Sequence, residues 1–548
     1  MRSNLKLHDI LRKMNGNSKK KNKKKAIIVA FDSGAARNFK MNSYLAEISS
    51  KDYEDMIVIG CDGTLKTCLP KRTSYDSQKI CDICVMKQNS LSKKYNLELF
   101  SIRNESINIE TYRNALDMNR WDLKTLNDWN YFGENLLNLI AWQYLIDSKK
   151  TTLNAENEKE KVLVLDLLRD VLNLNEFLNS NAKLFIERDV YMIDGNYVHH
   201  RIIYNFCKSL EIGSPKILVM SPLNRNGLIK YQIVNNTYRI DNFWENIGIR
   251  SVPTKIRFFQ TLTTINSLYK TFYFGSDRTF SAKNLNEFSK FFIEKISNFK
   301  EKEVFFTSST DEMAASLYYL GRNTQELVNE QRRQILMFAQ RAQKYPNKAF
   351  ILRFHPRNNN KNSMKIDSQD WLDLKHEIEK LDLMKNFFVV DSNVSISAYK
   401  LISLCNKVYT SWSTVGIEAV ALGVPVIQTQ EDLSLWKINH LNEVNNGTQK
   451  INDYLFLEWI NRYLVFPWKK ALVTYSSDIS TYDIRNSLLN IMIRYRWVRT
   501  MLYKITLNLN KFKLPSSILL NSLYNKITIA VLLIYLRVKR WFYFKKEN

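Results

Sequence analysis

Two short segments of this 548-residue chain combine the residue types that bind and release phosphate. In residues 409–427 an apolar strand is predicted to run into hydroxyl residues, a helix, a glycine and another strand. Ser413 or Thr414 can cap that helix, so its free N–H groups and positive dipole end would face an anion. Glu418 follows on the same helix, where a carboxylate suits ribose hydroxyls better than a phosphate. The segment predicts a nucleotide pocket.

The second segment is a predicted buried strand at residues 349–354 that runs into His355 and Pro356. Proline ends the strand, and in an open parallel sheet ligands bind beyond the carboxyl ends of strands. His355 is therefore expected beside the nucleotide pocket predicted at residues 409–427. There an imidazole can donate a hydrogen bond or a proton to a departing phosphate. Arg353 and Arg357 would add positive charge there, and they would equally suit an exposed strand end.

Together these motifs resemble the nucleotide-binding half of GT-B glycosyltransferases that build bacterial capsule and lipopolysaccharide chains. The Kdo-transferase-like group, which uses a CMP-activated sugar, is the most similar. The resemblance implies that His355 assists departure of the nucleotide phosphate, and that Ser413 and Thr414 hold this phosphate. It further implies that Glu418 binds the nucleoside. It covers residues 300–430, and only loosely the N-terminal half. Polyol-phosphate transferases of teichoic acid synthesis carry similar motifs, so the donor stays open.

Two carboxylates could activate an acceptor hydroxyl as a general base. Asp32 directly follows the first predicted strand, whose end should face the crevice between the domains, although aspartate is also a common turn residue. Glu312 follows Ser308 and Ser309 in a segment that resembles the first strand-end loop of the family's C-terminal domain. Those two serines predict a second anion-binding loop or a helix cap.

The elements that must position these residues alternate between strand and helix. Repeated βα units predict an α/β, GT-B-like chain with two Rossmann-like, doubly wound parallel-sheet domains that face a cleft. We place the parts at residues 1–25 (basic arm), 26–295 (acceptor domain), 296–465 (nucleotide-sugar domain) and 466–548 (crossover and basic amphipathic C-terminal extension). No two aspartates stand at i and i+2, so transfer is expected to need no metal ion, and dinucleotide and P-loop motifs are absent.

The net charge of +26 is concentrated at the two ends of the chain. Residues 1–25 carry +9 and residues 494–548 carry +11, which leaves +6 for the 468 residues between them. In the C-terminal segment the charge accompanies aromatic residues and an apolar run at 527–536, about half the length that a membrane span needs. This predicts a tail that lies on an anionic membrane, and the alternative is a helix packed on the core with basic edges.

Six cysteines do not describe a disulfide scaffold. Cys61, Cys68, Cys81 and Cys84 could bind a structural zinc ion, or they could be four reduced thiols, because the first gap is wider than zinc sites normally use. No secretory signal is visible, so the chain is expected in the cytoplasm, and its basic tail would hold it on the inner face of the cytoplasmic membrane.

These features favour a glycosyltransferase with a nucleotide-sugar donor and a glycan or glycolipid acceptor. The competing class is a non-catalytic binder of polyanions such as RNA. Nucleic acid is not expected as a partner because the body of the chain is nearly neutral.

Overall fold

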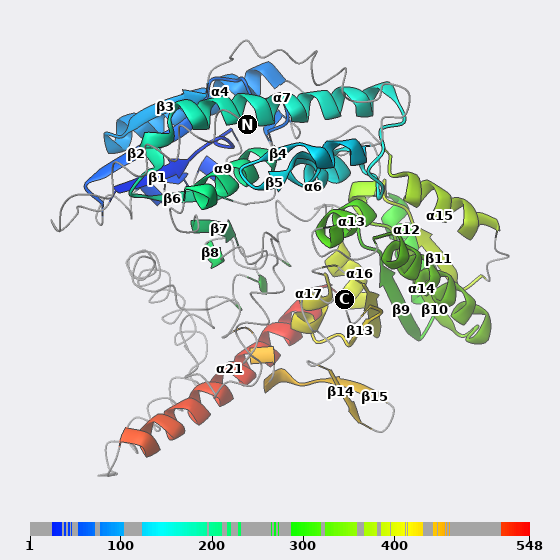
Figure 1. Cartoon of the computed structure of the whole chain (residues 1–548). Coiled ribbons are helices and arrows are strands. Elements are labelled where there is room, and N and C mark those ends of the chain that lie inside the picture. Colours follow the sequence, from blue (N-terminus) through cyan, green and yellow to red (C-terminus); the bar gives the residue numbers. More distant parts are fainter. Residues whose placement is uncertain are drawn as a thin grey trace.

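The protein is described from a computed structural model (Figure 1). It describes most of residues 25–102, 123–210 and 287–460, strands at 216–220 and 228–231, single residues between 265 and 272, and 517–547. Residues 1–24 of the predicted basic arm and residues 461–516 lie outside the described residues.

The N-terminal half is built on a six-stranded sheet in the order β3-β2-β1-β6-β7-β8. All neighbouring strands are parallel except β7 and β8. The strands are β1 (Lys25–Val29), β2 (Asp55–Cys61), β3 (Glu98–Ile102), β6 (Arg188–Ile193), β7 (Lys216–Met220) and β8 (Leu228–Tyr231). The order reverses between β1 and β6, so the switch point where such sheets bind ligands lies at the ends of these two strands.

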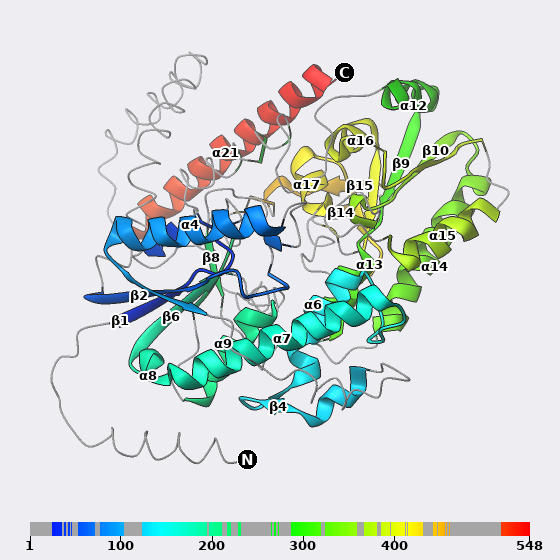
Figure 2. The same ribbon diagram turned by 90° about the horizontal axis from the view of Figure 1, so that it is seen from above.

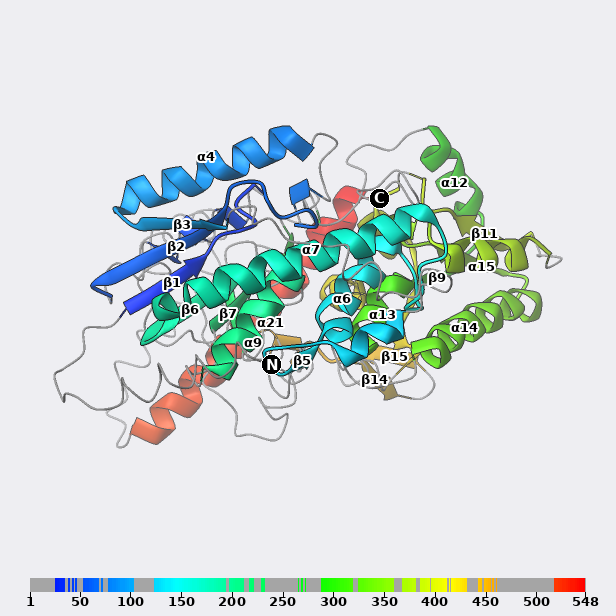
Figure 3. The same ribbon diagram turned by 45° about the horizontal axis from the view of Figure 1, so that its top comes forward.

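The apolar side chains of β1 point alternately to the two faces of this sheet, and both faces are covered by helices. Ile27 and Val29 belong to one apolar cluster with Leu167 of helix α7 (Glu158–Ser180), and Ile28 belongs to another with Leu91 of helix α4 (Ser77–Tyr95). Successive side chains of a strand point to opposite faces, so a continuous apolar run must be buried on both. Figure 3 shows α4 on one face and α7 on the other.

In the N-terminal half, a 3-10 turn and a two-stranded hairpin come before helix α6 (Leu136–Ser148). The Asn135 side chain caps α6 by accepting a hydrogen bond from the Asn138 N–H. The elements are α4 (Ser77–Tyr95), η1 (Leu123–Asp128), β4 (Asn130–Tyr131), β5 (Glu134–Asn135), α6 (Leu136–Ser148), α7 (Glu158–Ser180), α8 (Ala182–Phe185) and α9 (Val198–Ser209).

The C-terminal half repeats the plan with a five-stranded, all-parallel sheet in the order β11-β10-β9-β12-β13. Its strands are β9 (Glu301–Phe306), β10 (Lys348–Arg353), β11 (Phe387–Val390), β12 (Lys407–Thr410) and β13 (Val426–Gln428), and a hairpin β14 (Asn442–Asn445) and β15 (Thr448–Ile451) follows. The helices are α12 (Glu287–Ser297), α13 (Thr310–Tyr318), α14 (Thr324–Lys344), η2 (Pro356–Asn358), α15 (Gln369–Lys380), α16 (Ala398–Leu404) and α17 (Val415–Leu422). The predicted α/β class with two doubly wound sheets is confirmed, and the N-terminal sheet departs from an all-parallel one only in its antiparallel edge strand β8.

The two halves meet along α6 and α13, which lie side by side in Figures 1 and 3. Ala314 and Ala315 of α13 are buried in the N-terminal apolar cluster. The Tyr318 hydroxyl donates to Asn138 Oδ1 over 2.8 Å. The small side chains of α13 and the hydrogen bond between the two helices hold the two halves together at this contact.

The last described helix, α21 (Ser517–Glu547), packs one side on the C-terminal core (Figure 2). Leu532, Leu536 and Tyr543 are buried in the cluster that contains β9, α16 and α17 residues. The Arg540 guanidinium donates to the Val420 and Ala421 carbonyls, both over 3.0 Å, and so caps the end of α17. This part of the predicted tail therefore adopts the core-packed alternative on one side. None of the described helices is long and apolar enough to cross a membrane.

Candidate functional site

The C-terminal switch point gathers hydroxyl residues at neighbouring strand ends. Strand β9 lies between β10 and β12, so the residues after these three strands share one edge of the sheet. Thr307 and Ser308 follow β9, His355 follows β10, and Ser413 follows β12. The His355 N–H donates to Thr307 Oγ1 over 2.8 Å, which ties two of these strand ends together.

His355 is held as a neutral imidazole with one defined hydrogen. Its pKa is lowered to about 4 by burial and then by the nearby Arg357 charge. Its Nδ1 accepts the Arg357 backbone N–H over 3.3 Å, so the ring hydrogen belongs on Nε2. The side chain is partly exposed. In this state His355 can donate a hydrogen bond to a phosphate oxygen, and an incoming phosphate would raise its proton affinity.

The two arginines that flank His355 are engaged by protein groups. Arg353 is buried and donates to the carbonyls of Asp391 and, over 3.1 Å, Val394. Burial lowers the pKa of Arg353 to about 10. The guanidinium groups of Arg353 and Arg357 both donate hydrogen bonds to other protein groups. Phosphate binding by these two arginines stays a prediction.

Arg357 joins the two halves of the chain. Its guanidinium donates to Asp311 Oδ2 over 3.1 Å, to Glu312 Oε1 over 3.2 Å and to the Ile146 carbonyl at the end of α6 over 2.9 Å. Glu312 keeps 42% of its side chain exposed. The structure thus places Glu312 and Arg357 together at the seam between the domains.

Ser309 is buried, and its hydroxyl donates to the Asp311 carboxylate, whereas the buried Ser308 uses its backbone N–H to donate to Gln331 Oε1 over 2.9 Å. Ser413 is partly exposed, and its Oγ accepts the Val415 N–H over 3.3 Å. Thr414 lies outside the described residues. Ser413 therefore caps the start of α17, as its position in the sequence predicts.

Glu418 lies inside the protein and not on an open face of α17. It is buried among side chains that include Tyr399, whose hydroxyl donates to Glu418 Oε1 over 3.3 Å. Among the described residues, Glu418 Oε2 has no hydrogen-bond partner. Burial raises the pKa of Glu418 to about 8, so the carboxyl is largely protonated at neutral pH.

The stability of the protein should respond to this proton. The folded state keeps the Glu418 proton between about pH 4.5 and 8, where the unfolded chain has released it, so stability falls as the pH rises through this interval. We expect Glu418→Gln to stabilise the protein by roughly 4 kcal/mol at pH 8 and to have no effect below pH 4.5. Thermal unfolding of the wild type and of Glu418→Gln between pH 4.5 and 8 measures this difference in stability. The same stability difference at every pH would show that Glu418 is not protonated in the folded protein.

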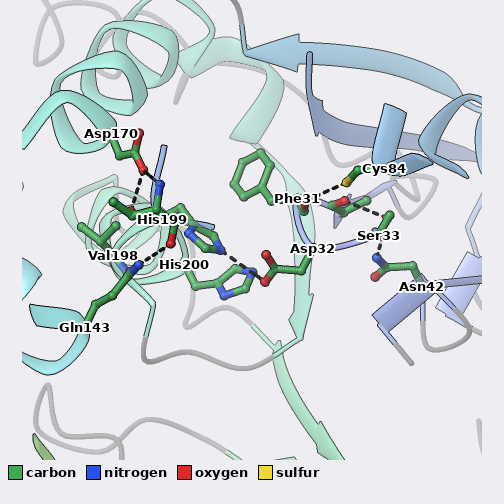
Figure 4. Close-up of polar contacts among 12 residues, drawn as sticks. Phe31, Asp32, Ser33, Asn42, Cys84, Gln143, Asp170, Val198, His199 and His200 are labelled. Carbon is green, nitrogen blue, oxygen red and sulfur yellow. Dashed lines mark hydrogen bonds and ion pairs between the residues drawn. The ribbon is translucent and has the colours of Figure 1, made fainter. Parts of the chain in front are cut away.

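At the N-terminal switch point Asp32 meets a pair of histidines to which the sequence patterns gave no role (Figure 4). Asp32 follows β1, and His199 and His200 lie in the first turn of α9, after β6. The Asp32 Oδ2 atom lies 3.3 Å from His199 Nε2 and 4.0 Å from His200 Nε2. All three side chains are buried, and burial lowers the pKa of His200 to about 3. The sequence feature that could have indicated this cluster is the pair of adjacent histidines at the start of a helix.

A buried lysine at the seam was also missed. Lys149 caps the C-terminal end of α6 in the left-handed conformation, with φ of 54°, and its side chain is buried. Burial lowers its pKa to about 8, against the opposing effect of Asp311. Lys149 is also among the charges that act on His355. It therefore belongs to the same charged neighbourhood as the predicted phosphate site.

The four clustered cysteines are buried free thiols. Cys81 and Cys84 lie in α4, the Cys84 thiol donates to the Phe31 carbonyl over 3.1 Å, and the Cys61 sulfur accepts the Gly63 N–H over 3.3 Å. Of the described residues, the set with three ligand atoms within 4.8 Å of one another is Asp32, His199 and His200, and it contains no thiol. The structural zinc at the cysteines stays a prediction.

Comparison with known proteins finds similarity only among solved structures. No family model and no curated protein matches the chain. The UDP-GlcNAc 2-epimerase of Methanocaldococcus jannaschii in complex with UDP-GlcNAc and UDP is 11% identical over 81% of this chain and 100% of its own, with a TM-score of 0.28. The Neisseria meningitidis enzyme bound to UDP-GlcNAc is 9% identical over 76% and 85%, with a TM-score of 0.23.

A third solved structure, the Thermosulfurimonas dismutans KpsC β-Kdo 2,4 transferase, is 11% identical over 52% of this chain and 87% of its own, with a TM-score of 0.29. These TM-scores are too low to establish a common fold, so the architecture rests on the two sheet orders of the chain itself. The chain is thus an α/β protein with two doubly wound, mainly parallel sheets, and the proteins to which it is similar include a Kdo transferase and UDP-GlcNAc 2-epimerases.

Proposed function

We propose that the protein is a glycosyltransferase that moves a sugar from a nucleotide donor to a growing cell-surface glycan or a lipid-linked acceptor. The donor nucleotide would bind at the C-terminal switch point, and the acceptor would bind on the N-terminal side. A CMP-activated sugar such as CMP-Kdo is the donor to test first, given the resemblance of the motifs.

One observation carries this proposal. The ends of β9, β10 and β12 bring Thr307, His355 and Ser413 to one edge of a parallel sheet. The neutral His355 ring has an Nε2 hydrogen to donate, and the start of α17 adds helix N–H groups. Donors of this kind stabilise the negative charge that develops on a leaving phosphate. The nucleoside contact that the motif resemblance implies for Glu418 stays a prediction, because this carboxyl is buried beside Tyr399.

The acceptor side rests on Asp32. A general base must remove the proton of the acceptor hydroxyl, and Asp32 stands at the switch point of the other sheet. Glu312 remains the second choice for this role because it lies at the seam between the domains, where Arg357 holds it in place.

Membrane attachment is part of the proposal and would use the outer side of α21. Trp541 and Phe542 are 56% and 43% exposed, and Lys545 lies over the Trp541 ring at 5.0 Å from its centroid. Aromatic and basic side chains together favour the headgroup layer of an anionic membrane. A protein bound there would meet lipid-linked acceptors at the cytoplasmic face.

A thermal-shift panel of nucleotides on the full chain tests the function. We expect one nucleotide, with CMP tried first, to raise the melting temperature, because a ligand at 100 times its Kd adds about 2.7 kcal/mol. Ser413→Ala should reduce that shift when each protein is compared with its own ligand-free state. A response to RNA and heparin without any response to mononucleotides would instead identify a polyanion binder.

A further inference from the structure

We infer that Asp32, His199 and His200 form a binding site for one divalent transition-metal ion, with Zn²⁺ as the best-suited ion. Two imidazoles and a carboxylate are ligands that zinc accepts together. The inference goes beyond the proposed function, since the transfer proposed above needs no metal ion and could proceed with this site empty.

The spacing of the three ligand atoms fits a single ion. Zinc ligands lie about 2.0–2.1 Å from the metal, so two ligands of a tetrahedral ion are separated by about 3.3 Å. Asp32 Oδ2 lies 3.3 Å from His199 Nε2 and 4.0 Å from His200 Nε2, and the three ligand atoms all lie within 4.8 Å of one another. The edge from Asp32 to His199 already has the required length, and the edge from Asp32 to His200 must shorten by about 0.7 Å. The third edge, between the two histidines, is within 4.8 Å and must shorten as well if it is near that limit.

A hydrogen bond between Asp32 and His199 does not explain why His200 is buried beside them. The imidazole of His200 is 1% exposed, lies 4.3 Å from that of His199 between ring centroids, and at 4.0 Å it is too far from Asp32 for a hydrogen bond. Among the described residues, the buried Nδ1 atom of His200 also has no hydrogen-bond partner, and burial of such a polar atom is costly. An ion would engage both Nε2 atoms and the carboxylate at once, and so would use all three buried groups.

The neighbouring residues fix the start of α9, and with it both histidines (Figure 4). Gln143 Oε1 accepts the Val198 N–H over 3.0 Å, and its Nε2 donates to the Thr67 carbonyl. Asp170 accepts the Thr67 N–H over 2.8 Å and the Thr67 hydroxyl over 2.6 Å. This chain of bonds runs from α6 and α7 to the first residue of α9. Ligands held in this way lose little freedom when an ion binds.

Aromatic rings form the wall of the site. Phe31 packs edge-on to the His199 ring at 5.5 Å and stacks on the His200 ring at 6.3 Å, and Tyr197 stacks on His199 at 5.7 Å. Apolar walls strengthen the attraction between a cation and a carboxylate by keeping water away. The Nδ1 atoms of both histidines have no hydrogen-bond partner among the described residues. Because such partners raise metal affinity about 10–100-fold, we expect binding in the micromolar range and not tighter.

Three protein ligands leave a fourth position for water or for a hydroxyl. An ion there would lower the pKa of a bound hydroxyl, which is the task that the acceptor side of the proposed transferase requires. This consequence, unlike metal binding itself, rests on the proposed function.

Cobalt titration of the tag-free, chelator-stripped full chain tests the site. We expect one Co²⁺ per chain, with the visible bands of a tetrahedral nitrogen and oxygen site, and displacement by one equivalent of Zn²⁺. His200→Ala and Asp32→Asn should each weaken binding by about 10²-fold or more. His376→Ala is the matched control and should leave cobalt binding unchanged, because His376 lies on α15, which is far from α9 in Figures 1 and 2.

Three results would overturn the site. The first is no specific binding, and the second is equal binding by wild type and His200→Ala. The third is a sulfur-to-cobalt charge-transfer band, which would place the ion at the cysteines. Thermal unfolding checks that each variant is folded, and His200→Gln replaces His200→Ala if the latter is not. The nucleotide-induced thermal shift is recorded on the same samples, so failure of the metal site and failure of the transferase proposal are seen separately.

Discussion

Replacement of His355 by alanine is expected to lower the rate of sugar transfer by about 10²-fold or more while nucleotide binding is largely kept. The ring is neutral and its Nδ1 atom accepts the Arg357 N–H, so its hydrogen belongs on Nε2, and the proposed function uses this hydrogen to stabilise the leaving phosphate. Without that hydrogen the phosphate leaves with a less stabilised charge. Initial rates with saturating donor, together with calorimetric donor affinity, measure the two quantities.

His355→Gln separates two roles of the imidazole. A glutamine amide can donate a hydrogen bond but cannot deliver a proton, so partial rescue would assign hydrogen-bond donation, and no rescue would assign general acid catalysis. Thr307→Val removes the hydroxyl that accepts the His355 backbone N–H and should have a smaller effect, because it only positions the loop. Near-normal transfer by His355→Ala would remove this residue from the chemistry.

Deletion of residues 514–548 is expected to unfold the C-terminal half of the protein. It removes Leu532, Leu536 and Tyr543 from a shared apolar core and exposes the end of α17 that Arg540 caps. Truncation of one buried large side chain costs about 2–5 kcal/mol, and whole domains are stable by only about 5–15 kcal/mol. Circular dichroism and gel filtration of the truncated chain should show loss of cooperative unfolding and aggregation.

A double variant separates this structural role from membrane binding. Trp541→Ala with Phe542→Ala alters two exposed side chains, so it should change stability by only about 0.5 kcal/mol per site. If α21 also contacts lipid, the same variant should sediment less with anionic liposomes. A truncated chain that stays folded and monomeric would contradict the packing of α21, and unchanged liposome binding by the double variant would remove its outer side from membrane attachment.

The sequence alone determined the local elements and their order. Continuous apolar runs such as 26–31 and 349–354 must be buried on both faces, so they predicted central parallel strands. A proline or hydroxyl residue that follows such a run marks the strand end, which is why His355 and Ser413 were predicted at one edge of a sheet. Both signals depend only on neighbouring residues.

The tertiary structure alone decided what each polar side chain contacts. Asp32 meets His199, 167 positions away in the sequence, because β1 and β6 are neighbours in the sheet. Arg357 binds Asp311 and the end of α6, because the two halves pack there. The sequence pattern predicted that Glu418 would lie beside ribose hydroxyls, but α17 is so closely covered that this residue is buried. Packing between elements that are distant in the sequence sets these contacts. Such packing cannot be predicted from residue spacing, because the spacing along one helix or strand does not show which distant element covers it.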